Sequence, residues 1–222
     1  MNSHSMPISA PPPKPRKSPV QARSMATVDA IHMATIQVLA AEGLALCTTT
    51  RVAERAGVSV GSLYQYYPNR RSLLAAVLGR HLDQVAVAVE QACIAQRRKP
   101  IADMAHELVY AFLGAKLEHP SASKALYAVA EEHGGALLVA HAKGRMHRAV
   151  ASMLDTATDA RFDDLSTASL LTMSAMIGPA QALLEDDASA ELVDVLQAHL
   201  CTLIQAYLRA ISLSVPTGKS TE

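Results

Sequence analysis

The sequence predicts an all-α protein with about nine helices, and three observations support this fold class. Apolar residues recur at helical spacing from about Met25 to Leu213, no window alternates as a strand does, and glycine or proline interrupts the pattern between segments. Half of the 222 residues are hydrophobic and 18% are charged, which excludes a disordered chain and allows a sizeable core. We expect a small three-helix N-terminal domain followed by a larger C-terminal helical bundle.

The N-terminal segment differs from the rest of the chain. Residues 1–22 hold six of the eleven prolines, and proline lacks the backbone donor that helices need, so we expect a disordered arm. This segment has no apolar stretch typical of a secretory signal, and the three cysteines are far apart, so we expect a reducing cytoplasm. The arm's cations are either part of a solvated tail or contacts to nucleic acid. These cations are Lys14, Arg16, Lys17 and Arg23.

The formal charge of the whole chain is zero, but the charges are unevenly distributed. From Lys14 to Arg80 the sequence has nine lysines and arginines against three acidic residues, a net charge of +6, so the remainder carries −6. A basic N-terminal part joined to an acidic remainder indicates a polyanionic partner at the N-terminal end.

The region from residue 25 to residue 96 is predicted to form four helices, at about 25–42, 49–56, 60–67 and 70–96. Gly43 and Gly57 end the first two helices. Hydroxyls at residues 48–50 and at Ser59 suit the starts of the second and third. Two short helices joined by a turn at Gly57 are typical of a helix-turn-helix, whose second helix enters the major groove of DNA.

Five more helices are predicted beyond residue 100, at about 100–118, 121–132, 137–156, 164–185 and 189–213. The last has two apolar stripes, wider than one neighbour would cover. We therefore expect it to form a four-helix dimer interface with residues 165–184 and their mates, burial within one bundle being the alternative. The stripes are Leu192, Val195, Leu196, His199 and Leu203, and Val193, Leu200, Ile204, Leu208 and Ile211. Six polar residues within 165–184 argue against a membrane span there.

The run from Thr49 to Leu74, TTRVAERAGVSVGSLYQYYPNRRSLL, strongly resembles the DNA-binding signature of the TetR/AcrR family of bacterial transcriptional repressors. It departs at Tyr67, where phenylalanine is usual, and at Arg70, where lysine is common. The resemblance covers about residues 25–80. It implies a homodimer that binds a palindromic double-stranded DNA operator and is released when a small apolar or amphipathic effector enters the C-terminal bundle. The implied domains are a helix-turn-helix domain at 23–70, a ligand-binding and dimerisation domain at 71–213, and a tail at 214–222.

The resemblance and the helix-turn-helix geometry together assign DNA contacts to the two short helices. Gln65 is the best candidate for direct readout, because its amide can pair bidentately with adenine. The residues expected to face bases are Thr50, Val60, Gly61, Ser62 and Gln65. The residues expected to hold phosphates are Thr49, Tyr64, Tyr66 and Arg70.

The effector site is only weakly indicated by the sequence. Methionines and a phenylalanine at helical spacing are compatible with an adaptable apolar pocket, although the same pattern is typical of ordinary core. The candidates are Met104, Tyr110, Phe112, His141, Met146, Met173, Met176 and Gln181. We find no catalytic motif, metal site or cofactor motif and expect a protein that is not an enzyme. A DNA-binding or architectural protein without an effector, and an all-helical enzyme, are the alternatives.

Overall fold

The computed structural model describes residues 19–131, 135–185 and 188–213. These residues form nine α-helices and no strand, which confirms the predicted fold class. The helices are α1 Pro19–Glu42, α2 Thr49–Ala56, α3 Val60–Tyr66, α4 Arg70–Ala95, α5 Ile101–Leu117, α6 Pro120–Glu131, α7 Gly135–Leu154, α8 Leu165–Glu185 and α9 Ala190–Ile211.

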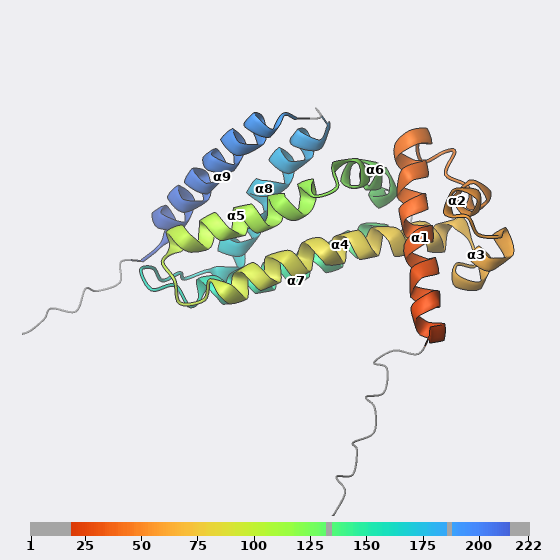
Figure 1. Ribbon diagram of the computed structural model, residues 1–222. Helices are drawn as coiled ribbons and strands as arrows, with labels where there is room; N and C mark the ends of the chain where they lie inside the picture. Colours follow the sequence, from red (N-terminus) through yellow and green to blue (C-terminus); the bar gives the residue numbers. More distant parts are fainter. Residues whose placement is uncertain (1–18, 132–134, 186–187, 214–222) are drawn as a thin grey trace, which may run out of the picture.

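Figure 1 shows α1, α2 and α3 gathered at one end of the molecule and α8 and α9 in the bundle at the other. The long helix α4 runs from the first group into the bundle, and α6 lies beside α1. We call α1–α3 with the start of α4 the head. Because α4 belongs to both parts, a shift of α4 moves the head relative to the bundle.

The first helix begins earlier than the sequence predicts. It starts at Pro19, so residues 19–22 belong to α1 and not to the expected arm. Proline is well tolerated in the first turn of a helix, where a backbone N–H has no intrahelical partner. Arg23 therefore lies on α1, whereas the other arm cations and the expected C-terminal tail lie outside the described residues.

The head has its own apolar core, to which α6 contributes. Side chains of α1 to α4 pack together there, and Leu126 and Val129 of α6 complete the cluster. The members from the head itself include Ile31, Val38, Val52, Leu63, Leu74 and Val77, each at most 2% exposed. The head thus rests on a helix of the C-terminal domain through direct apolar packing.

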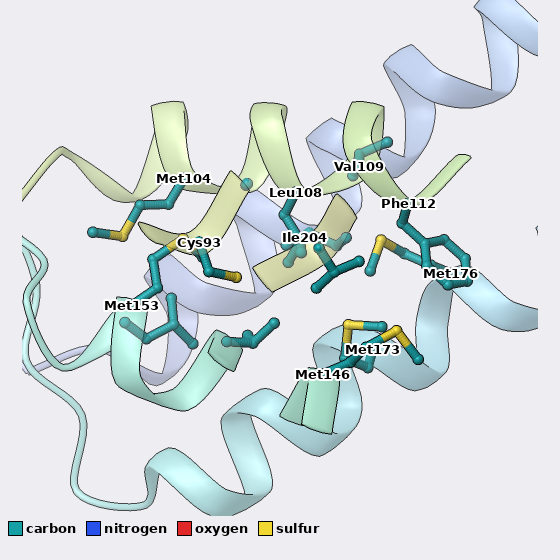
Figure 2. Close-up of a cluster of buried hydrophobic side chains, with 14 of the residues drawn as sticks. Cys93, Met104, Leu108, Val109, Phe112, Met146, Met153, Met173, Met176 and Ile204 are labelled. Atoms are coloured by element: carbon teal, nitrogen blue, oxygen red, sulfur yellow. The ribbon is translucent and has the colours of Figure 1, made fainter. Parts of the chain in front are cut away.

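A second, larger core holds the bundle together. It joins α4, α5, α7, α8 and α9, and Figure 2 shows Phe112 beside Met176, with Met146 and Met173 close together below them. Unbranched methionine side chains fill irregular gaps between helices well. Cys93 and Cys201 belong to this core as free thiols, and burial raises the pKa of Cys93 to about 12, so both behave as small apolar residues.

Three helical segments are long and apolar enough to cross a membrane by length and composition alone: Arg23–Glu42, α4 and α8. In this fold each of them packs against other helices of the chain. The segment in α1 contacts α2, α4 and α6, while α8 contacts α5, α6, α7 and α9. Less than half of each segment is buried inside the described chain, so packing accounts for part of their apolar character.

Candidate DNA-binding and effector sites

The helix-turn-helix is built by local caps that the sequence predicts. The Thr48 side chain accepts a hydrogen bond from the backbone N–H of Arg51, and the Ser59 side chain accepts one from Ser62. Gly57 ends α2 with φ of 68°, in the left-handed region that glycine occupies without strain. These caps start and stop α2 and α3 within a few residues, and the buried Leu63 anchors α3 from behind.

The outer face of α3 carries the side chains expected to contact bases. Gly61 and Gln65 are exposed, as is Thr50 of α2, and Val60 and Ser62 are half-buried. The Ser62 hydroxyl hydrogen-bonds to that of Ser59, with 2.8 Å between the oxygens. The five residues predicted to face bases therefore all retain solvent access on the two short helices.

Two of the tyrosines near α3 make polar contacts of different kinds. The Tyr64 hydroxyl is exposed and lies 3.3 Å from the Thr49 hydroxyl, so α2 and α3 present these two groups together. The Tyr67 hydroxyl lies 2.6 Å from Nε2 of the buried His32. Tyr67 thus ties the end of α3 to α1, a polar role that its hydroxyl makes possible where phenylalanine is usual in the family pattern.

Arg70 has a structural role that the sequence analysis did not foresee. Its Nε donates to the carbonyl of Cys47 at 2.7 Å and its Nη2 donates to the carbonyl of Leu44 at 2.6 Å. Both carbonyls belong to the loop between α1 and α2, so the guanidinium ties the start of α4 to that loop. These two bonds give Arg70 a structural role in the head, and the expected contact of Arg70 with phosphate stays a prediction.

We expect Arg70→Lys to lower the free energy of unfolding by about 1–3 kcal/mol, because one ammonium cannot reach both carbonyls and leaves a part-buried acceptor unpaired. Chemical denaturation measures this loss, and Arg71→Lys at the exposed neighbouring position serves as the matched control. The DNA affinity of Arg70→Lys should fall by the same factor for every DNA sequence. The slope of log affinity against log salt concentration should not change. Two results together would favour a phosphate contact as the main role of Arg70. They are full stability of Arg70→Lys, and a decrease of about 1 in the slope of log DNA affinity against log salt concentration for Arg70→Met.

A cavity of about 220 Å³ lies within the C-terminal domain, lined by residues of α4, α5, α6, α7 and α8. Its apolar lining includes Leu78, Leu82, Val85, Phe112, Leu126 and Met146. Polar groups on the same wall are His81, Lys116, Ser123, Tyr127, Lys143 and Gln181. An apolar cavity with a few polar groups is the usual form of a small-molecule site.

Three of the eight predicted effector residues line this cavity, namely Phe112, Met146 and Gln181. The other five do not line it. Met104, Met173 and Met176 are buried in the bundle core, as ordinary core methionines are. Tyr110 and His141 are exposed on the surface of α5 and α7. Helical spacing alone did not distinguish core residues from cavity-lining residues, because residues of both kinds face the inside of the bundle. It also did not indicate His81, Lys116 and Tyr127 as lining residues.

The cavity is connected to the head through α6. Leu126 of α6 and Leu78 of α4 line the cavity and also belong to the core cluster of the head. A group that occupies the cavity would therefore contact side chains on which the head rests. The structure thus supplies a short physical connection between the cavity and the DNA-binding helices.

His81 makes the stability of this region depend on pH. Burial, and then the charges of Lys116 and His119, lower the pKa of His81 to about 4, so the folded protein holds the neutral ring. The unfolded chain takes up its proton near pH 6.5. The stabilisation from His81 is therefore complete above about pH 6.5 and is lost as the pH falls toward 4.

We expect the wild-type protein to lose about 2 kcal/mol of unfolding free energy from His81 between pH 7 and pH 5. His81→Gln should remove that part of the loss, and His141→Gln, the same change at an exposed position, should not. Urea denaturation at several pH values measures the difference. An identical pH dependence in wild type and His81→Gln would contradict this assignment. Burial also lowers the pKa values of His32 and His147, so some pH dependence remains in the variant.

The outer face of α8 and α9 carries a row of exposed apolar side chains. Leu200, Ile204 and Leu208 of α9 are buried in the bundle, and Leu196 is half-buried against the same core, whereas the remaining apolar members of its stripe are exposed. The exposed members are Leu170, Leu171, Leu192, Val195 and Leu203, each between 46% and 53% exposed. A shallow groove between Leu171 and Leu203 runs along this face and is lined by Thr172, Ser174, Ala175, Ile204 and Tyr207. One predicted stripe of α9 is thus largely buried, apart from the exposed Ile211, and the other is largely on the surface, apart from the half-buried Leu196.

The head and the C-terminal bundle each match a known protein family. Residues 31–77 match the model of the tetR family of bacterial regulatory proteins, and residues 100–208 match the model of the tetracyclin repressor-like C-terminal domain. The HTH-type transcriptional repressor KstR from Mycolicibacterium smegmatis is 36% identical over 62 residues, which cover 28% of this chain. That match spans 30% of the length of KstR.

Solved structures share the fold over nearly their whole length. The fatty acid degradation regulator FadR from Bacillus halodurans has a TM-score of 0.69 and 15% identity over 88% of this chain and 99% of its own. A TetR-family regulator from Mesorhizobium loti has a TM-score of 0.69 and 16% identity, over 86% and 99%. These identities establish a common architecture and nothing about ligands. With a family match in the head and another in the bundle, the chain belongs to the TetR family, which consists of transcriptional regulators with a helix-turn-helix DNA-binding domain and not of enzymes.

Proposed function

We propose that this regulator is a cytoplasmic repressor that binds a palindromic operator as a homodimer and leaves it when a small molecule fills the cavity. The observation that carries the proposal is the capped helix α3, with Gly61 and Gln65 exposed on its outer face and Leu63 holding it from behind. A helix presented in this way suits the major groove. The predicted base and phosphate contacts, including that of Arg70, belong to this proposal.

Dimerisation through α8 and α9 is supported by the exposed apolar row on their outer face. Soluble monomers rarely expose contiguous apolar patches that are larger than a few hundred Å². A second copy related by a twofold axis presents the same row, so the two rows pack against each other and form a four-helix interface. Two heads held in this way would read two half-sites about one helical turn of DNA apart.

Release by an effector is supported by the cavity and by the position of α6. A constitutive DNA binder has no need of an internal cavity, whereas this cavity is walled by residues that also support the head. A ligand that prefers one position of α4 and α6 would shift the population of head positions by its differential affinity. An effector-independent architectural protein is the less well supported alternative.

A reporter assay in bacteria tests the proposed function. A promoter that contains a DNA sequence selected by the purified protein drives a fluorescent reporter, with and without the regulator. We expect expression to fall when the wild-type protein is present and to recover with Gln65→Ala, while Gln91→Ala, an exposed glutamine on α4 outside the head, represses normally. Increased expression with the wild-type protein would identify an activator, and unchanged expression would overturn regulation at that sequence.

A further inference from the structure

Four of the polar residues of the cavity, His81, Lys116, Ser123 and Tyr127, form one connected cluster. The Ser123 hydroxyl donates to the carbonyl of Lys116 at 2.6 Å and lies 3.3 Å from Nε2 of His81. Because the hydroxyl has one hydrogen and gives it to the carbonyl, Nε2 of the neutral His81 ring is the donor to Ser123. The Lys116 ammonium lies over the ring of Tyr127, 5.2 Å from its centre.

A second lysine adds to this charge. Lys143 of α7 also lines the cavity, and burial together with the Lys143 charge lowers the pKa of Lys116. No aspartate or glutamate is among the described residues of the lining. Glu185, one helical turn beyond the lining residue Gln181, accepts a hydrogen bond of 2.7 Å from the Gln181 amide and is not itself part of the lining. Two lysines therefore line a mainly apolar cavity whose described wall contains no anion.

A partly buried cation without an anionic partner costs free energy, and a ligand anion that enters the cavity removes that cost. The rest of the lining requires an apolar ligand body, since leucine, valine, phenylalanine and methionine side chains form most of it. At about 220 Å³ the cavity is smaller than the pockets of about 300–1,000 Å³ that hold drug-sized ligands. A single aliphatic chain or one ring with its substituent suits this space.

We propose that the cavity binds an amphipathic monocarboxylate, with its carboxylate on Lys116 and Lys143 and its apolar body between Leu78, Phe112 and Met146. The Tyr127 hydroxyl adds a hydrogen-bond donor to the carboxylate end, and neutral His81 positions Ser123 and the Lys116 backbone without adding charge. This inference rests on the proposed role of the cavity as the effector site and names the chemical class of the effector.

Calorimetric titration of the full chain at pH 7.5 with three probes of equal chain length tests the proposal: decanoate, 1-decanol and decylamine. We expect decanoate to bind at least about tenfold more tightly than 1-decanol, and decylamine to bind least, because only decanoate pairs with the lysines. Lys116→Met should weaken the binding of decanoate by about tenfold and leave the affinity for 1-decanol unchanged. Lys143→Met, at an exposed position, gives a second variant in case Lys116→Met does not fold. Lys99→Met, an exposed lysine outside the lining, is the matched control.

The outcomes separate this inference from the proposed function. Equal affinity for decanoate and 1-decanol, no binding of either probe, or decanoate binding that neither lysine variant weakens would overturn the carboxylate assignment. A gel-shift assay with operator DNA, run with the same probes, reports on effector release separately. If decanoate binds through the lysines but operator DNA stays bound, the ligand class stands and the release step of the proposed function fails.

Discussion

Replacing Leu203 with aspartate is expected to convert the proposed dimer into monomers and to weaken operator binding by at least about 100-fold. Leu203 is 53% exposed in the described chain and lies beside Leu171 at the groove between α8 and α9. A carboxylate there would be buried against its own copy across the twofold axis, without a partner. Each half-site would then be bound singly, and the avidity that comes from two linked heads, of order 10²–10⁴, would be lost.

Analytical ultracentrifugation gives the oligomeric state, and fluorescence anisotropy with operator DNA gives the affinity. Leu137→Asp is the matched control, since Leu137 of α7 is 78% exposed and outside the α8–α9 groove. It should leave both measurements unchanged. A Leu203→Asp protein that remains dimeric and binds the operator normally would show that the dimer uses another surface.

Removing the Gln65 amide is expected to relax sequence preference at one base pair in each half-site, at a cost of about 1–3 kcal/mol. Gln65 is exposed on α3, and its amide makes no hydrogen bond within the described residues. It is therefore available for bidentate pairing with adenine in the major groove.

Binding of Gln65→Ala to a set of operators with single base changes measures this loss. Tyr64→Phe is the comparison, because a lost phosphate contact should weaken every operator by the same factor. Gln91→Ala controls for loss of an exposed amide outside the head. Unchanged preference at every operator position in Gln65→Ala would remove Gln65 from the readout.

Local signals made the head predictable from sequence. Threonine and serine caps, a left-handed glycine and a small apolar core each act over a few residues, so the limits of α2 and α3 follow from residue types. The role of Arg70 did not follow in this way, because its acceptors Cys47 and Leu44 lie 23 and 26 residues away. An arginine in a basic turn looks the same whether it is directed at phosphates or at a loop of its own chain.

The cavity was harder to predict than the fold. Phe112 and Met104 are both inward residues of α5, yet Phe112 lines the cavity and Met104 lies in the core. Which of them borders the cavity depends on how α5 packs against five other helices, and helical periodicity contains no such information. Lys116 was missed for the same reason, since a lysine is read from sequence as a solvent-exposed cation.

Selection of binding sites from random duplex DNA by the purified full-length protein tests the central claim most directly, when it is combined with the mass of the resulting complex. The claim is that a twofold pair of α3 helices reads DNA. We predict an enriched inverted repeat whose half-sites are about one helical turn apart, 10–10.5 base pairs, bound by two protomers. An enriched sequence without inverted symmetry that is bound by one protomer, or no enrichment at all, would contradict it.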